Sequence, residues 1–308
     1  MFWKRKNKNK EAEEAPAEEI AEPVNINVVV KTDLGNVRTN NEDTASFFRM
    51  ADNNLLREKG YLLIVADGMG GHQAGEVASR MAVEIISEEY FRPSPGVGKE
   101  KLLNKAFNIA NTKIFDLASA NDIYRGMGTT CTVLVIYGNA IYYGHVGDSR
   151  AYLCKNKKIS QITQDHTYVQ ELVSNGDITA EQAHTHPQRN VLTNAMGTKP
   201  TLRVDTGKYQ LSFTENDRLL LCSDGLYDYL SEEEIGVAMS AGSLQEVADH
   251  FINEAKRRGG KDNISVVLAE LAAFKDDSNV RSTREVDMLK MTRDADIPAN
   301  LNSTDHDR

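Results

Sequence analysis

Short apolar runs rich in branched residues alternate along the chain with longer segments of helical periodicity. The short runs predict strands at residues 26–33, 61–67, 129–138, 139–148, 149–156, 158–163, 217–224 and 262–271. The longer segments predict helices at 74–91, 101–118, 231–239 and 243–258. Ser231 and Glu234 have the spacing of a capping box, which supports the start of the third helix.

Very short separations join the four predicted strands between residues 129 and 163. They lie at Gly138-Asn139, at Gly147-Asp148 and at Lys155 to Lys158. Because a parallel crossover needs a dozen or more residues, we expect antiparallel hairpins at all three places. Antiparallel strands with inserted helix pairs predict a layered α+β domain whose helices pack outside the sheets, in preference to a parallel doubly wound sheet.

Length and composition indicate one domain with tails. The chain has 308 residues, 40% of them hydrophobic, which suffices for one large core. Residues 11–23 are acidic, alanine-rich and broken by prolines, and the residues after Lys275 are charged with few large apolar groups. We therefore expect a mobile extension at 1–24, one folded domain at 25–272 and a mobile tail at 273–308.

The charge balance and the cysteine content restrict partners and compartment. With 36 basic and 45 acidic residues the net charge is -9, which gives no overall reason to bind nucleic acid. Three cysteines are too few and too oddly numbered for a disulfide framework, so we expect a reducing, cytoplasmic setting. We also expect a monomer. No apolar run is long enough to span a bilayer, although Phe2 and Trp3 beside basic residues leave surface contact open.

Four aspartates stand where an apolar strand meets a small polar residue. Asp67, Asp148 and Asp224 each end a predicted strand, and Asp262 immediately precedes one. Any one of them alone favours a turn or a helix cap. Four together predict convergence, and convergent carboxylates need cations to remain ionised. Oxygen ligands without thiolates or clustered histidines suit the hard ions Mg²⁺ and Mn²⁺.

A cationic side chain precedes a further acidic pair in LGNVRTNNEDTASF. Arg38 lies a few residues before Glu42 and Asp43. A guanidinium can bind two phosphate oxygens while metals activate water, which is the division of labour that phosphoester hydrolysis requires. A surface salt bridge in a turn is the alternative interpretation of the same residues.

Several segments in order resemble the motifs of the type 2C metal-dependent serine/threonine protein phosphatases, particularly their compact bacterial members. The resemblance covers about residues 25–271, and its segments are RTNNEDTASF, VADGMGGHQAGEVAS, GMGTTCTVLV, AIYYGHVGDSRAYL, DHTYVQELVSNGDITAEQAHTHPQRNVLTNAMG, LLLCSDGLYDYL and GGKDNISVVL. It implies a four-layer αββα sandwich with two central antiparallel sheets flanked by helix pairs. It also implies two Mn²⁺ or Mg²⁺ ions per active site, with a weaker third.

The resemblance assigns a role to each candidate side chain. It implies that Asp67 bridges both metals, with the Gly68 carbonyl on the first and with Asp224 and Asp262 completing the second. Asp148 matches the ligand of the third ion, shared with Asp224, while Glu42 and Asp43 act mainly through metal-bound waters. A water bridging the metals would attack phosphorus with no covalent intermediate, and Arg38 would bind the phosphate oxygens.

The leaving oxygen needs a proton, and the histidine after the DGMGG turn is the candidate donor. His72 holds that position, with metal-bound water as the competing donor and a helix cap as the plain alternative. The glycines of the turn, Gly68, Gly70 and Gly71, would keep side chains away from the metals and permit the reversal into the helix.

Other candidate sites favour structural interpretations. His166, His184 and His186 show no zinc spacing, and their segment resembles the flap beside the active site in the bacterial branch. Cys131, Cys154 and Cys222 are expected to be inert core residues.

Function is therefore expected to be hydrolysis of phosphoserine and phosphothreonine in proteins, opposing a serine/threonine kinase. A pseudophosphatase that only binds phosphoproteins and a hydrolase of small phosphoesters remain alternatives.

Overall fold

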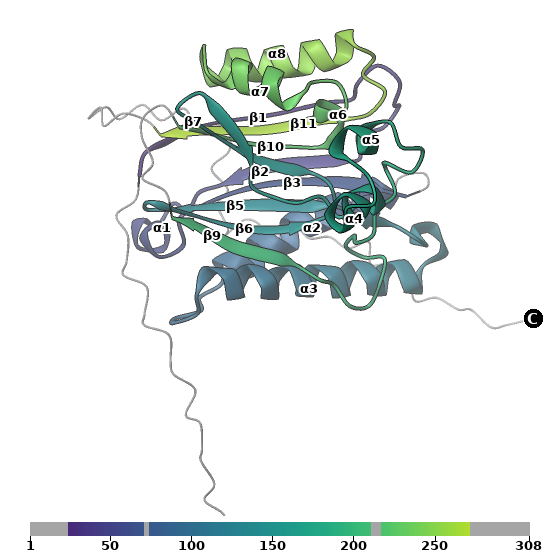
Figure 1. Cartoon of the computed structure of the whole chain (residues 1–308). Helices are drawn as coiled ribbons and strands as arrows, with labels where there is room; N and C mark the ends of the chain where they lie inside the picture. The colour runs from purple at the N-terminus through teal and green to yellow at the C-terminus, as the bar shows by residue number, and fades with distance from the viewer. Residues whose placement is uncertain (1–23, 71–73, 211–216, 272–308) are drawn as a thin grey trace, which may run out of the picture.

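Two antiparallel sheets lie face to face at the centre of the molecule, and helices cover the outer face of each (Figure 1). The computed structural model describes residues 24–70, 74–210 and 217–271. Helices α2 and α3 cover one sheet, whereas α7 and α8 cover the other (Figure 1). The predicted four-layer αββα arrangement is therefore confirmed.

The five-stranded sheet has the order β1-β11-β10-β7-β8, and the six-stranded sheet has the order β2-β3-β5-β6-β9 with β4 paired to β3. The strands are β1 Ile26–Asp33, β2 Asp43–Phe48, β3 Tyr61–Met69, β4 Gly128–Thr129, β5 Cys131–Tyr137, β6 Ala140–Val146, β7 Arg150–Lys155, β8 Lys158–Gln161, β9 Asp205–Gln210, β10 Arg218–Cys222 and β11 Ile264–Leu271. The helices are α1 Asn53–Lys59, α2 Ala74–Phe91, α3 Lys99–Ala120, η1 Asp122–Tyr124, α4 Tyr168–Asn175, α5 Ala180–His184, α6 Asp224–Tyr227, α7 Glu232–Met239 and α8 Leu244–Arg257.

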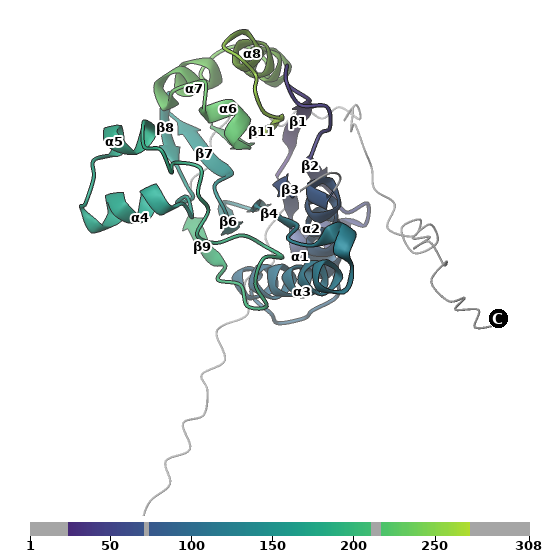
Figure 2. The same ribbon diagram turned by 90° about the vertical axis from the view of Figure 1, so that its right-hand side faces the viewer.

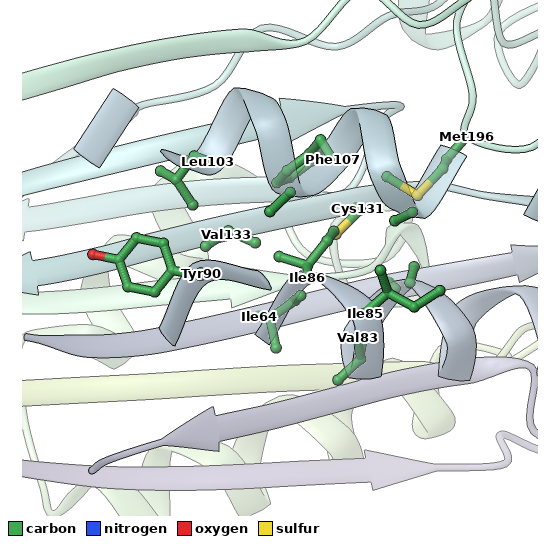
Figure 3. Close-up of a cluster of buried hydrophobic side chains, with 14 of the residues drawn as sticks. Ile64, Val83, Ile85, Ile86, Tyr90, Leu103, Phe107, Cys131, Val133 and Met196 are labelled. Atoms are coloured by element: carbon green, nitrogen blue, oxygen red, sulfur yellow. The ribbon is translucent and has the colours of Figure 1, made fainter. Parts of the chain in front are cut away.

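The continuous apolar run of β3 reflects burial on both of its faces. Because successive side chains point to opposite faces, Ile64 packs with the helix-facing core and Leu63 packs between the sheets. Figure 3 shows the helix-facing core, where Phe107 of α3 and Ile86 of α2 meet Ile64 and Val133. A strand that is buried on both faces consists mainly of apolar residues, which explains the run YLLIV at residues 61–65.

The outer layer on the other side is built from amphipathic helices. Phe251 and Val247 of α8 and Ile235 of α7 pack on strand residues such as Leu220 and Val266. Both helices begin with the reciprocal hydrogen bonds of a capping box, as the spacing of Ser231 and Glu234 predicts for α7.

The hairpin predicted at Gly147-Asp148 is wrong. Strand β6 pairs with β5 and β9, whereas β7 pairs with β10 and β8, so the chain passes from one sheet to the other between them. Gly147 has φ +102°, and a Cβ there would lie 2.6 Å from the Thr130 Cβ. Short spacing alone therefore cannot distinguish a hairpin from a step between stacked sheets. The hairpins β5–β6 and β7–β8 are confirmed.

The apolar pattern predicted none of seven elements, which are β2, β9, α1, η1, α4, α5 and α6. The predicted extension at 1–24 lies outside the described residues except for Val24, and the tail at 273–308 lies wholly outside them. The assigned boundaries of the catalytic domain stay a prediction. Within the described ranges, no helix has the length and apolar character needed to cross a membrane.

Candidate metal-binding active site

Two acidic residues of the six-stranded sheet lie directly opposite each other. The antiparallel register of β2 and β3 pairs Asp43 with Asp67. Residues paired across antiparallel strands have their Cβ atoms about 5 Å apart, so the two carboxylates are neighbours. Thr130 fixes the Asp67 backbone, because its hydroxyl accepts from the Asp67 amide at 2.9 Å and its amide donates to the Asp67 carbonyl at 2.9 Å.

The five-stranded sheet contributes Asp224 and Asp262 to the same region. Asp224 begins α6 immediately after β10, and Asp262 precedes β11, the strand that pairs with β10. The Ser223 hydroxyl donates to Oδ2 of Asp43 at 2.7 Å and so links the two sheets. Figure 2 views the molecule from the end of the sheets where α6 lies.

Asp148 occupies the step between the sheets, where several polar contacts fix the backbone. The Tyr227 hydroxyl donates to the Asp148 carbonyl at 3.0 Å. The guanidinium of Arg150 lies 3.7 Å from the centre of the Tyr227 ring and binds Asp165 through Nε and Nη2 at 3.0 and 2.7 Å. The segment that was wrongly predicted as a hairpin therefore carries the candidate ligand Asp148.

Burial and mutual repulsion perturb the pKa of the clustered carboxyls. Burial is the main cause in each case, and neighbouring carboxylates add to it. The pKa values of Asp67 and Asp224 are raised well above the ordinary range, that of Asp43 to about 6 and that of Asp148 to about 7. Asp67 is affected by Asp43, Asp224, Asp148 and Asp262, so the structure brings the predicted acidic residues together.

One oxygen of this cluster has no partner among the described residues. Oδ1 of Asp224 is buried and accepts no hydrogen bond there. A buried, unsatisfied carboxylate oxygen is costly, and a divalent cation with oxygen ligands would satisfy it. In the described ranges, however, no three carboxylate, histidine or cysteine side chains are arranged as a complete ligand set. The donors thus suit Mg²⁺ or Mn²⁺, while their arrangement is not that of a closed metal cage.

Arg38 and Glu42 flank the carboxylate cluster. Nη2 of Arg38 donates to Oδ2 of Asp262 at 2.7 Å, and the Arg38 side chain is 47% exposed. This ion pair joins Arg38 to the predicted metal site, in contrast to the isolated turn salt bridge considered above. The Glu42 carboxylate packs against Gly75 in the first turn of α2, and burial raises the pKa of Glu42.

Asn263 holds the loop that carries Arg38, Glu42 and Asp43. Its Oδ1 accepts from the Glu42 amide at 2.8 Å, and its Nδ2 donates to the carbonyls of Leu34 and Asn40 at 3.1 Å each. The side chain is 3% exposed. Sequence analysis missed this role, because an asparagine at a strand start gives no local signal of a contact more than 200 positions away.

Gly68 is required by a close approach of the backbone. A Cβ at this position would lie 2.1 Å from the carbonyl oxygen of Gly75 and 2.6 Å from that of Glu42. The space at Gly68 is therefore limited by the start of α2 and by the loop before β2. The sequence analysis had instead expected metals and their waters to limit it. Gly70 has φ +153°, which favours glycine as predicted. Gly71 and the predicted proton donor His72 lie outside the described residues.

His166, the first histidine of the 165–190 segment, has structural contacts. His166 is buried, accepts from the Gly147 amide at 3.1 Å through Nδ1 and lies 3.0 Å from Asp205 through Nε2. This arrangement supports the structural interpretation and ties the start of the segment to the Asp148 step. The segment forms the short helices α4 and α5 beside the sheets (Figure 2).

Comparison with known proteins supports the class of enzyme that this site indicates. The family model for protein phosphatase 2C matches residues 39–269. The serine/threonine phosphatase stp of Listeria monocytogenes is 39% identical over 244 residues, which are 78% of this chain and 94% of that protein.

Comparison with solved structures indicates the same class of enzyme. The serine/threonine phosphatase Stp1 of Staphylococcus aureus superposes with a TM-score of 0.76 at 33% identity, covering 84% of this chain and all of that one. The catalytic domain of the phosphatase PstP, in complex with two manganese ions, gives 0.69 at 35% identity over 80% of this chain and 99% of that one.

The fold and the carboxylate cluster thus define a metal-dependent serine/threonine protein phosphatase. The chain belongs to the protein phosphatase 2C family. The predicted resemblance, the predicted fold and the predicted class of reaction are confirmed.

Proposed function

We propose that this chain removes phosphate from phosphoserine and phosphothreonine in proteins at the cluster formed by Asp43, Asp67, Asp148, Asp224 and Asp262. The observation that carries the proposal is the convergence of buried, mutually repelling carboxylates from both sheets, one of them with an unpartnered oxygen. Such a cluster is unfavourable unless cations neutralise it. The family relationship supplies the substrate class.

The proposed ligands are those that the family resemblance implies. Asp67 would be shared by two ions, with the Gly68 carbonyl on one and with Asp224 and Asp262 on the other. Asp148, with Asp224, would hold a third. Glu42 and Asp43 would act through water, which agrees with the hydrogen bond that already occupies Oδ2 of Asp43. We assign Mn²⁺ or Mg²⁺ to the centre, two ions by analogy with PstP.

When bound, the ions would supply a water of lowered pKa and charge neutralisation for the phosphate. The chain itself would orient the substrate. Arg38, which is half exposed and paired with Asp262, would donate to the non-bridging phosphate oxygens. Asn263 would hold the loop that carries Arg38 in position. His72 is proposed to protonate the leaving serine or threonine oxygen.

The cysteines support attack by water rather than by a protein nucleophile. Cys131 and Cys222 are fully buried, and burial raises the pKa of the Cys222 thiol to about 12 and that of Cys131 higher still. A protonated, buried thiol is a poor nucleophile. No covalent enzyme intermediate is therefore included in the proposed reaction.

Manganese binding and turnover together test the proposal. Calorimetric titration of the full chain with Mn²⁺ should show binding that Asp67→Asn weakens strongly, and hydrolysis of a phosphothreonine peptide should depend on added Mn²⁺ and disappear in the variant. Asp116→Asn, on the exposed face of α3, is the matched control and should change neither. Unaltered binding in Asp67→Asn would place the metals elsewhere, and binding without turnover would favour a pseudophosphatase.

The cellular assignment is a separate part of the proposal. We propose a cytoplasmic monomer that opposes a serine/threonine kinase and acts on that kinase's targets. Three free, buried cysteines are compatible with a reducing compartment. A phosphopeptide hydrolysed much faster than a small phosphoester at equal concentration would support protein substrates.

A further inference from the structure

A groove of about 680 Å³ lies between α7 and α8 in the outer helix layer, apart from the carboxylate cluster. Its apolar lining includes Leu230 and Val247, which belong to the core, and Val237, Ala238 and Ala241 of α7 and the turn after it. The Val237 side chain is 69% exposed. An exposed apolar groove of this kind is typical of a helix or peptide docking surface.

The rim of the groove is acidic. Its charged side chains are Glu233, Glu234, Glu246 and Arg258, three acidic and one basic, which gives a net charge of -2. Nη2 of Arg258 forms an ion pair with Oε1 of Glu234 at 2.6 Å. Glu246 accepts the hydrogen bonds that cap α8, and Glu233 is exposed in the first turn of α7. A basic, partly apolar segment would complement this surface.

The C-terminal segment starts beside this groove. Strand β11 ends at Leu271, and the preceding residue, Glu270, accepts from Nε of Arg218 at 3.0 Å. The other nitrogens of Arg218 donate to the carbonyls of Ala241 at 3.1 Å and Gly242 at 2.6 Å. Ala241 and Gly242 line one end of the groove. Arg218 thereby connects the last described strand to the groove.

Residues 280–293, VRSTREVDMLKMTR, have the matching chemistry. Four basic and two acidic side chains give a net charge of +2, opposite to the rim. Val286 and Leu289 are three positions apart, the spacing of neighbours on one helix surface. Residues 272–279 can reach at most about 27 Å when extended, which is longer than α7 at about 12 Å.

We propose that residues 280–293 of the same chain dock in the groove between α7 and α8. The apolar side chains of the segment would cover Val237 and Ala241, and its basic side chains would lie near Glu233. Because the segment is joined to β11 next to the groove, docking is intramolecular and gains the high effective concentration of a tethered ligand.

Photo-crosslinking in the full chain tests this proposal. The photoreactive residue p-benzoylphenylalanine replaces Val237 in one variant and, in a second, Glu233, both exposed positions where folding should survive. Phosphatase activity of each variant verifies the fold. Digestion and mass spectrometry should locate the crosslink in residues 280–293. The same probe at Ile123, which is 75% exposed on η1, is the control and should give several-fold less of that product.

Variants in the C-terminal segment test whether residues 280–293 themselves occupy the groove. Leu289→Asp removes one anchoring leucine and should reduce the crosslink roughly tenfold or more, as expected from the loss of one buried leucine. Ile297→Asp, outside the docking segment, should leave it unchanged. Yields independent of protein concentration support docking within one chain. A yield that rises with concentration would identify a second copy as the occupant, and a yield no higher than at Ile123 would show an empty groove; either result overturns the proposal.

Discussion

Replacement of Asp43 by asparagine should stabilise the metal-free protein. Asp43 is buried, faces Asp67 across the β2–β3 ladder and has its pKa raised from 3.8 to about 6 by burial and by Asp262. At a pH above both values, the shift of roughly two units costs about 3 kcal/mol of folding free energy. The amide introduced by Asp43→Asn would carry no charge, and its oxygen could still accept from the Ser223 hydroxyl.

The sign of the pH dependence follows from the direction of the shift. A carboxyl whose pKa is higher in the folded state favours folding when protonated, so this stability is present below pH 3.8 and is lost as the pH rises through about 6. The advantage of Asp43→Asn should therefore be largest near neutral pH. It should fall to about half near pH 5 and vanish in more acidic buffer, because wild-type Asp43 then also carries a proton.

Thermal unfolding in EDTA, followed by circular dichroism, measures the effect. For a domain of this size about 3 kcal/mol corresponds to a rise in melting temperature of roughly 5–10 °C. Excess Mn²⁺ should reduce the difference, since bound cations neutralise the cluster in the wild type. Asp116→Asn, exposed on α3, should change the melting temperature little at any pH. An Asp43→Asn protein that melts no higher than the wild type in EDTA would refute the repulsion argument.

Three further changes should have distinct outcomes. In steady-state kinetics, Arg38→Ala should raise KM for a phosphopeptide more than it lowers kcat. Arg38→Lys should have an intermediate effect, because a lysine keeps the charge but lacks the forked donors. Gly68→Ala should prevent native packing, since its Cβ would lie 2.1 Å from the Gly75 carbonyl oxygen; a wild-type melting curve would contradict this. Phe107→Ala, on the fully buried face of α3, should lower stability by about 3–5 kcal/mol in urea titrations.

The apolar pattern was sufficient for elements in which apolar or branched residues cluster or recur at regular spacing. Helix α2 has the predicted bounds 74–91, and β1 and β11 lie where branched residues cluster. It was insufficient for β9, which reads DTGKYQ and lies at the edge of its sheet, where few side chains are covered. Edge strands of this kind carry little hydrophobic signal, so their pairing depends on the neighbouring strand rather than on their own residues.

The candidate site was predictable in its acidic residues and unpredictable in what holds them. Aspartates at strand ends are visible in the sequence because they interrupt apolar runs. Asn263 and Ser223 are not, since each acts through a hydrogen bond to a residue about 180 or more positions away. The crossing between the sheets at Gly147 was predicted as a hairpin, because the spacing of two strands in the sequence does not determine which sheet each one joins.

The position of β11 has a consequence for synthesis of the protein. The last strand lies between β1, the first, and β10, and it pairs with both of them. A chain still growing on the ribosome therefore leaves β1 without its neighbour, and it lacks the Asp262 end of the cluster until almost all of residues 24–271 have emerged. On the proposed ligand assignment, an unfinished polypeptide therefore lacks part of its metal site until the last strand is made.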